Sequence, residues 1–223
     1  MNIVVVKSKK RKRSMQISIK NVDQVLVSVP FFTAQKAIDN FINSNLPWIH
    51  KNLSKIKKVP IKNFIEGEKF LIMGNSVPLV FSNTKKSKNL LNVEKNSFVY
   101  YGKNTSSAEL KYQFLKFYKK FGKQYATIKS NEFAKILKKD INKVTIKNIK
   151  TQWGSCSNKN NLNYNYKLFM APKEVVNYVI AHEVAHLKHK HHKKSFWDLV
   201  EQLYPNYKVY RKWLKTNGHT LTI

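Results

Sequence analysis

The sequence Ala181-His182-Glu183-Val184-Ala185-His186-Leu187 overlaps the end of a run, residues 175–185, in which nearly every position is apolar. Such a run predicts a helix that is buried on most sides, because a surface helix keeps one polar face. On a helix, His182 and His186 are one turn apart and their rings lie on the same face. Two histidines and a glutamate are costly to bury without partners. The stretch therefore predicts a buried helix whose polar side chains share a partner.

A divalent metal ion would be a suitable partner for these side chains. Two histidines four residues apart, with glutamate directly after the first, form the HExxH pattern, in which the imidazoles bind one ion and the carboxylate takes a proton from water. Only three positions are fixed, so the pattern also occurs by chance in helices that bind nothing. The apolar surroundings favour the metal. We therefore expect His182 and His186 to bind one zinc ion per chain, with Glu183 as the catalytic base.

The charge of the chain is unusually positive. Its 223 residues include 42 Lys or Arg and 12 Asp or Glu, a formal net charge of +30. Such an excess attracts polyanions and predicts salt-dependent binding to nucleic acid. Arginine, whose planar fork suits specific contacts with nucleic acid, occurs only at Arg11, Arg13 and Arg211, and the lysines are spread over every segment. The expected partner is therefore a non-specific one, nucleic acid or another polyanion, and compositional bias is an equally simple explanation.

Other features of the composition indicate where the protein works. The single cysteine, Cys156, excludes an internal disulfide and suits a reducing compartment, and we expect it to be a packing residue. No apolar run has the length of a membrane span, and residues 1–13 place their charges after a short apolar stretch, unlike a secretory signal. We expect a cytoplasmic protein with no membrane partner.

The first part of the chain, residues 1–104, predicts a β-rich region with helices and no catalytic cluster. Alternating or apolar runs predict strands at 15–19, 25–29, 70–73, 77–81, 90–93 and 98–101, with a turn at 21–23. Between the second and third strands, Thr33 is expected to cap a helix that Pro47 interrupts. This region is expected to serve as a scaffold or a substrate platform.

Residues 105–223 predict the catalytic domain. A long helix with an aromatic stripe is expected over 106–137, followed by strands at 143–149 and 161–170. The helix of the two motif histidines begins at Pro172, and Ser195 is expected to cap the next helix. The fold class is therefore α+β, with a division at 104/105 between two regions that can also pack as one continuous unit.

Several stretches of the second half resemble the YgjP-like metallopeptidase family. They are TQWGSC at 151–156, LNYNYKLFMAP at 162–172, YVIAHEVAHLKHKHH at 178–192, YPNYK at 204–208 and RKWL at 211–214. The resemblance runs nearly end to end. It implies a zincin-like catalytic domain, a small sheet plus the HExxH helix, related to SprT-type proteases. Two positions depart from the pattern: Gln152 stands where the family usually has arginine, and Lys193 where serine is frequent.

The third metal ligand has several candidates. On a continuous helix His189 lies about 10 Å further along the axis than His182, which is too far for the same ion. His192 can return to the ion if the helix ends soon after the second motif histidine, and the family resemblance implies the same residue. Asp198 or Glu201 on the following helix are alternatives, as in sites with two histidines and a carboxylate. We take His192 as the expected third ligand.

Three protein ligands leave a fourth position to water, whose pKa the metal lowers toward neutrality. Glu183 would accept the proton of this water and deliver it to the leaving amine. The expected function is a zinc-dependent metallopeptidase that hydrolyses peptide or protein substrates. Two alternatives stay open: a metal-dependent phosphohydrolase or pyrophosphatase acting on nucleotides, prompted by Lys188, Lys190 and neighbouring lysines, and a protease associated with nucleic acid.

Overall fold

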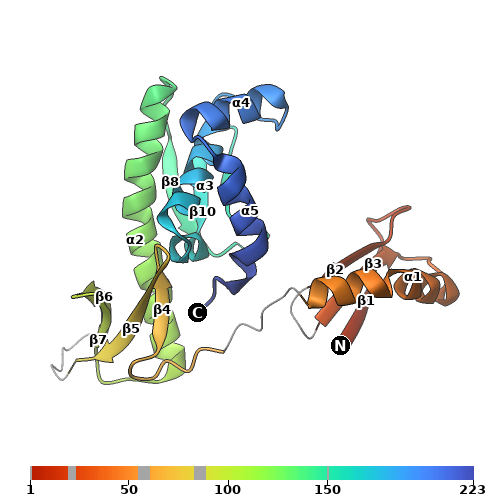
Figure 1. The fold of residues 1–223 in the computed structure, drawn as a ribbon, viewed down its shortest axis with the longest axis horizontal. Helices are drawn as coiled ribbons and strands as arrows, with labels where there is room; N and C mark the ends of the chain where they lie inside the picture. Colours follow the sequence, from red (N-terminus) through yellow and green to blue (C-terminus); the bar gives the residue numbers. More distant parts are fainter. Residues whose placement is uncertain (1, 20–23, 55–60, 83–88, 150) are drawn as a thin grey trace. The chain divides into compact units, whose positions relative to one another are not determined.

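The computed structural model describes residues 2–19, 24–54, 61–82, 89–149 and 151–223, so the turn expected at 21–23 lies outside the described residues. The chain forms two compact units, Met1–Pro60 and Ile61–Ile223 (Figure 1). Both contain helices and strands, and the α+β class is confirmed. The sequence placed the division at 104/105 instead, and the packing of the second unit explains this difference.

In its described residues, the first unit is a three-stranded sheet with one helix. Its elements are β1 (Asn2–Ser8), β2 (Gln16–Ile19), β3 (Gln24–Pro30) and α1 (Gln35–Leu53). The strand order is β1-β3-β2, with β1 parallel and β2 antiparallel to β3. Alternate residues of β3 (Val25, Val27 and Val29) are fully buried with Ile38 and Ile49 of α1. The period of two in this strand therefore builds the core of the unit.

Two details of α1 differ from the prediction. The residue at the N-cap is Ala34, and the Thr33 hydroxyl donates a hydrogen bond to the Pro30 carbonyl (2.9 Å) instead of capping the helix. Pro47 lies inside α1, which continues past it. Ile38 and Ile49 lie on either side of Pro47 and both enter the same core, so packing holds the two halves of the helix together despite the missing backbone donor.

The second unit begins with a four-stranded sheet and a long helix. The strands are β4 (Lys69–Ile72), β5 (Asn75–Phe81), β6 (Leu90–Glu94) and β7 (Ser97–Tyr101), in the order β4-β5-β7-β6, and the helix is α2 (Ser107–Ile136). The ring of Phe114 in α2 stacks on Phe70 at 4.1 Å and lies 5.0 Å from Phe98. The sheet therefore shares one core with α2, which is why its strands belong to the unit of the histidine helix.

A second, smaller sheet stands next in the chain. It consists of β8 (Lys143–Lys147), β10 (Asn161–Asn165) and β9 (Gly154–Cys156), with β10 in the middle. The strand predicted over 161–170 ends at Asn165, because the Asn165 side chain accepts a hydrogen bond from the Lys167 amide (3.2 Å) and begins the 3-10 helix η1 (Tyr166–Met170). Among the described strands, β9 pairs only with β10, so β9 is an edge strand.

Three helices and a final turn complete the unit: α3 (Lys173–Ala185), α4 (Lys194–Leu203), α5 (Tyr207–Asn217) and η2 (Gly218–Thr220). In Figure 1, α3 lies between α2 and α5, and nine of its thirteen residues are buried, as the apolar run predicted. Lys193 rather than Ser195 is the N-cap of α4. No helix in the described ranges is long and apolar enough to cross a membrane.

Candidate metal centre

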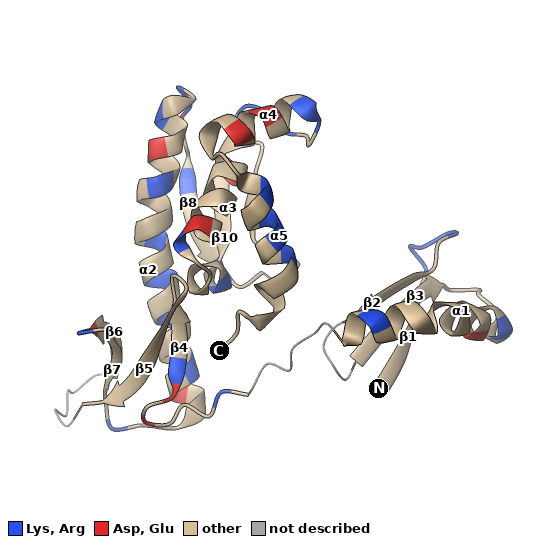
Figure 2. Ribbon diagram, in the orientation of Figure 1, with Lys and Arg blue, Asp and Glu red and all other residues tan. Residues whose placement is uncertain are grey.

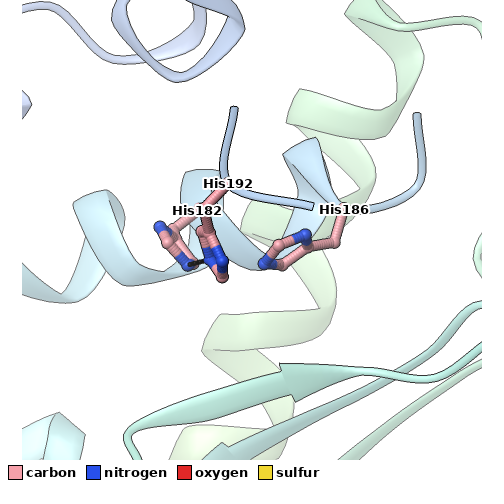
Figure 3. A group of neighbouring side chains, drawn as sticks. All are labelled: His182, His186 and His192. Carbon is pink, nitrogen blue, oxygen red and sulfur yellow. Dashed lines mark hydrogen bonds between the residues drawn. The ribbon is translucent and has the colours of Figure 1, made fainter. Parts of the chain in front are cut away.

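Three histidines come together at the end of α3. Ring nitrogens of His182, His186 and His192 lie within 4.8 Å of one another (Figure 3). The Nε2 atoms of His182 and His192 are 3.2 Å apart. The two carboxylates considered as alternative ligands make other contacts: Asp198 pairs with Lys194 (2.8 Å), and Glu201 accepts from the Asn206 amide (3.1 Å). The structure thus brings together the three histidines that the sequence singled out.

The chain reaches this arrangement because α3 ends early. The helix stops at Ala185, and the amide of His189 still donates to the Ala185 carbonyl (3.0 Å) as the chain turns back. Nδ1 of His186 lies 2.8 Å from the carbonyl oxygen of His189. A hydrogen bond there places the proton on Nδ1 and leaves Nε2 as the free electron-pair donor. His189 therefore serves the site through its backbone rather than its ring.

Phe196, at the start of α4, supports all three imidazoles. Its ring centre lies 4.9 Å from that of His182, 4.4 Å from that of His186 and 4.7 Å from that of His192. The side chain is fully buried. Next to it, Nε1 of Trp197 donates to the carbonyl of His192 at 3.1 Å. The docking of α4 on α3 therefore fixes the position of His192, which is on a loop.

Glu183 is packed directly against the edge strand β9. The residue is 5% exposed, and no described residue forms a hydrogen bond with its carboxylate that would orient it. A Cβ atom added to Gly154 would lie 2.6 Å from Cγ and 2.7 Å from Oε1 of Glu183. Only glycine allows β9 to pass this close to the carboxylate. The backbone of β9 thus holds the glutamate in place by contact.

The histidines and Glu183 form one wall of a pocket of about 300 Å³. Its other walls are Gln152, Gly154, Ser155, Cys156, Asn158 and Lys190. The Lys190 ammonium donates to Cys156 Sγ (3.3 Å), the Ser157 carbonyl (3.0 Å) and Asn160 Oδ1 (3.3 Å). This lysine joins the loop of the third histidine to the turn after β9. Burial raises the pKa of the Cys156 thiol, although Lys190 opposes the shift, in keeping with a packing residue.

The charge states of the site follow from its burial. Burial, together with the neighbouring His186, His192 and Arg211, lowers the pKa of His182 to about 3. Burial also lowers the pKa of His186. Both imidazoles are therefore neutral near pH 7, the state in which imidazole binds metal ions. Burial raises the pKa of Glu183 to about 8.

These residues fit a divalent metal ion. Ligand nitrogens on a tetrahedral zinc ion are about 3.3 Å apart when each bond is about 2.0–2.1 Å, close to the 3.2 Å between His182 and His192. The buried Nδ1 of His182 has no hydrogen-bond partner among the described residues, whereas its Nε2 faces Nε2 of His192. Imidazole donors suit zinc, copper, iron and nickel. The site thus has the ligands of a metal centre with one side open to the pocket.

Two contributors to the site were not predicted from the sequence: Phe196 and the carbonyl of His189. Each acts through a contact between segments distant in the chain or through the backbone. Gly154 stands inside the TQWGSC stretch, where a glycine in a strand already signals a close approach. Gln152, which stands in place of the usual arginine, lines the pocket.

An α+β unit with three convergent imidazoles and a buried carboxylate is typical of a metal-dependent hydrolase. The family model described as YgjP-like, metallopeptidase domain, matches residues 13–217, and the chain belongs to this family. The resemblance noted in the sequence is thereby confirmed. Among solved structures, the metallopeptidase zymogen of Pyrococcus abyssi abylysin shares 24% identity with a TM-score of 0.37, over 40% of this chain and 93% of that one. No curated protein matches the chain.

Proposed function

We propose that this protein is a zinc-dependent metallopeptidase of the HExxH type with a zincin-like catalytic arrangement. His182, His186 and His192 hold one zinc ion per chain, and Glu183 is the general base. The observation that carries the proposal is the convergence of three imidazole nitrogens within 4.8 Å, beside a buried carboxylate, in the wall of one pocket. Membership of a metallopeptidase family supports peptide or protein as the substrate class.

The chemistry divides between the ion and the carboxylate. A zinc ion at this site supplies Lewis acidity, which lowers the pKa of water toward neutrality and polarises a carbonyl group. Glu183 accepts the proton that water loses as it attacks the peptide carbon, and it then delivers the proton to the leaving amine nitrogen. Burial raises the pKa of Glu183 in the metal-free chain, and the positive charge of a bound zinc ion would oppose this shift and favour the carboxylate form that accepts the proton. The tight contact with Gly154 keeps the carboxylate at the pocket wall during both transfers.

The edge strand β9 offers a place for the substrate. Gly154, Ser155 and Cys156 line the pocket, and the described strands pair with β9 on one side alone. An extended peptide can add to such an edge through backbone hydrogen bonds. A substrate bound in this way has one of its peptide bonds beside Glu183, whatever the side chains of the substrate are.

The pocket geometry argues against the alternative of a nucleotide phosphohydrolase. That alternative was prompted by Lys188, Lys190 and neighbouring lysines, and among the described residues only Lys190 of this group lines the pocket. Its ammonium group already donates to a thiol, a carbonyl and an amide oxygen. A phosphate would have to replace these three contacts.

Metal analysis combined with peptide cleavage tests the proposed function. We expect purified protein to hold about one zinc ion per chain and His192→Ala to lose most of it. Glu183→Gln should keep the zinc and lose at least about 100-fold in kcat/KM, since proton transfer by a positioned group contributes roughly 10²–10⁴-fold. Undiminished cleavage by Glu183→Gln would refute the role of the glutamate, and full zinc content in His192→Ala would refute the third ligand.

A further inference from the structure

A cluster of cations and aromatic rings lies where strands β1 and β3 of the first unit end, outside the metal centre. Strands β1 and β3 are parallel, and Ser8 at the end of β1 is opposite Pro30 at the end of β3. The segments that follow the two strands therefore emerge side by side. Contacts confirm this: Lys7 Nζ donates to the Thr33 carbonyl (3.3 Å), and Lys9 Nζ lies 5.3 Å from the centre of the Phe31 ring.

The segment after β1 supplies the charge. The residues Lys7, Lys9, Lys10, Lys12 and Arg13 are all exposed, and Figure 2 shows this loop in blue. No carboxylate in the described part of the chain forms an ion pair with any of them. Residues 1–60 contain twelve Lys or Arg and only two Asp or Glu. Six of the twelve lie within residues 7–13, so half of the positive charge of this part of the sequence is concentrated in one short segment.

Arg11 has a different role from the other cations of the loop. Its guanidinium donates to Ser14 Oγ (2.9 Å) and to Gln16 Oε1 (2.9 Å). Gln16 is the first residue of β2, so these bonds fasten the loop to the sheet. The remaining cations are presented on a braced loop, which lowers the entropy lost when they bind a partner.

The segment after β3 supplies the rings. Phe32 is 94% exposed and Phe31 is 42% exposed, although phenylalanine is normally buried. The two rings meet edge to face, with centres 5.2 Å apart and an interplanar angle of 87°. Lys9 covers Phe31, whereas the Phe32 ring is open to solvent. An open ring beside uncompensated cations can stack on another flat group while the cations bind its charges.

We propose that this surface, formed by Lys7, Lys9, Lys10, Lys12, Arg13, Phe31 and Phe32, binds single-stranded nucleic acid. Lysine and arginine neutralise phosphates, and Phe32 stacks on an unpaired base, the combination that proteins use for single strands without sequence preference. The bases of a duplex are already stacked and cannot accept Phe32. A membrane-bound surface needs a broad apolar face, whereas two rings among five cations favour a polyanion that carries flat groups.

Binding of a fluorescein-labelled 20-nucleotide oligothymidylate to the full chain, followed by fluorescence anisotropy across a series of salt concentrations, tests this proposal. We expect Phe32→Ala to weaken binding roughly 5- to 150-fold, as stacking on one base is worth about 1–3 kcal/mol. Phe32→Trp should retain the affinity, because tryptophan also stacks. Ile61→Ala, at a residue that is 88% exposed, is the matched control and should bind as wild type does.

The charges are tested by a second pair of variants. Replacing Lys9, Lys10, Lys12 and Arg13 by Gln should reduce the slope of log affinity against log salt by about 3, since each phosphate contact on a single strand contributes about 0.7. The matched control replaces four exposed lysines of α2, Lys116, Lys119, Lys120 and Lys135, by Gln and should leave most of the slope unchanged.

Three results would overturn the proposal. An equal loss in both quadruple variants would show that net charge alone drives binding. Unchanged affinity in Phe32→Ala would exclude stacking. Binding to vesicles of equal phosphatidylcholine and phosphatidylserine, with none to the oligonucleotide, would assign the surface to a membrane. These measurements need neither the metal nor peptide cleavage, so their outcome does not depend on whether the protein is a peptidase.

Discussion

The close approach of β9 to Glu183 leads to a sharp prediction for Gly154→Ala. The added methyl group would lie 2.6 Å from Cγ, 2.7 Å from Oε1 and 2.8 Å from Cδ of Glu183. Carbon atoms in ordinary contact are about 3.5–4.0 Å apart, so Glu183 has to withdraw by about 1 Å. Glu183 is buried but borders the pocket, so its carboxylate is expected to shift toward the pocket and away from its place beside β9.

The expected result is a loss of activity without a loss of metal. A displacement of about 1 Å at a catalytic group can cost roughly 100-fold in rate, and overpacking costs about 1–3 kcal/mol of stability. The methyl group contacts no imidazole among its three nearest atoms, so zinc content should stay near that of wild type. The measurements are kcat/KM on a fluorogenic peptide, zinc per chain and thermal unfolding.

A second glycine variant serves as a control that distinguishes displacement of Glu183 from general destabilisation of the protein. Gly122→Ala is equally crowded, with its methyl group 2.4 Å from Phe169, but it contacts no pocket residue. It should lower the unfolding temperature and keep the activity of the folded fraction. If Gly154→Ala retains activity within about threefold of wild type, contact with β9 does not position Glu183. If it loses zinc and activity in parallel, the damage extends beyond the glutamate.

Three further predictions concern other contacts of the site. Phe196→Leu removes the ring that touches all three imidazoles and should weaken zinc affinity about 10- to 100-fold in competition with a chelating dye, the usual cost of losing a group that orients ligands. Lys190→Met removes three hydrogen bonds of the loop before His192 and should speed the release of zinc to a chelator, whereas Lys188→Met, at an exposed position, should not. In the metal-free chain, burial raises the pKa of Glu183 to about 8 from 4.5, so the native state holds the extra proton between these values and stability falls as pH rises through them. Glu183→Gln should therefore raise the unfolding temperature of the metal-free chain more at pH 8 than at pH 5, and an equal gain at both would contradict the raised pKa.

The helix that carries the site was predictable because its signals are local. The apolar run fixed α3, and the spacing of four placed His182 and His186 on one face. His192 required a turn that breaks the helical period, and the family resemblance was needed to choose it. Its metal-binding role, like that of the other two histidines, stays a prediction that metal analysis has to test.

The features that the sequence did not predict depend on contacts between distant segments. Helix α1 continues through Pro47 because residues on both sides of the proline pack into one core. Rules that consider only neighbouring residues do not include such packing. The alternating pattern predicted a strand over 161–170, but the strand ends at Asn165. The reason is that the Asn165 side chain accepts a hydrogen bond from the backbone amide of Lys167. The contact between Gly154 and Glu183 spans 29 residues. Spacing along the chain cannot reveal which backbone passes beside a catalytic carboxylate.

The position of His192 also makes the candidate metal site depend on the docking of α4. His182 lies in α3 and His186 is its C-cap residue, whereas the carbonyl of His192 accepts a hydrogen bond from Trp197 and its ring packs on Phe196. A chain in which α3 alone had folded would present two of the proposed ligands, and the third would join them only after α4 had docked. If the three imidazoles bind one ion, as proposed, tight metal binding requires α4 to be docked, and an ion bound by all three would report that the C-terminal helices are in place.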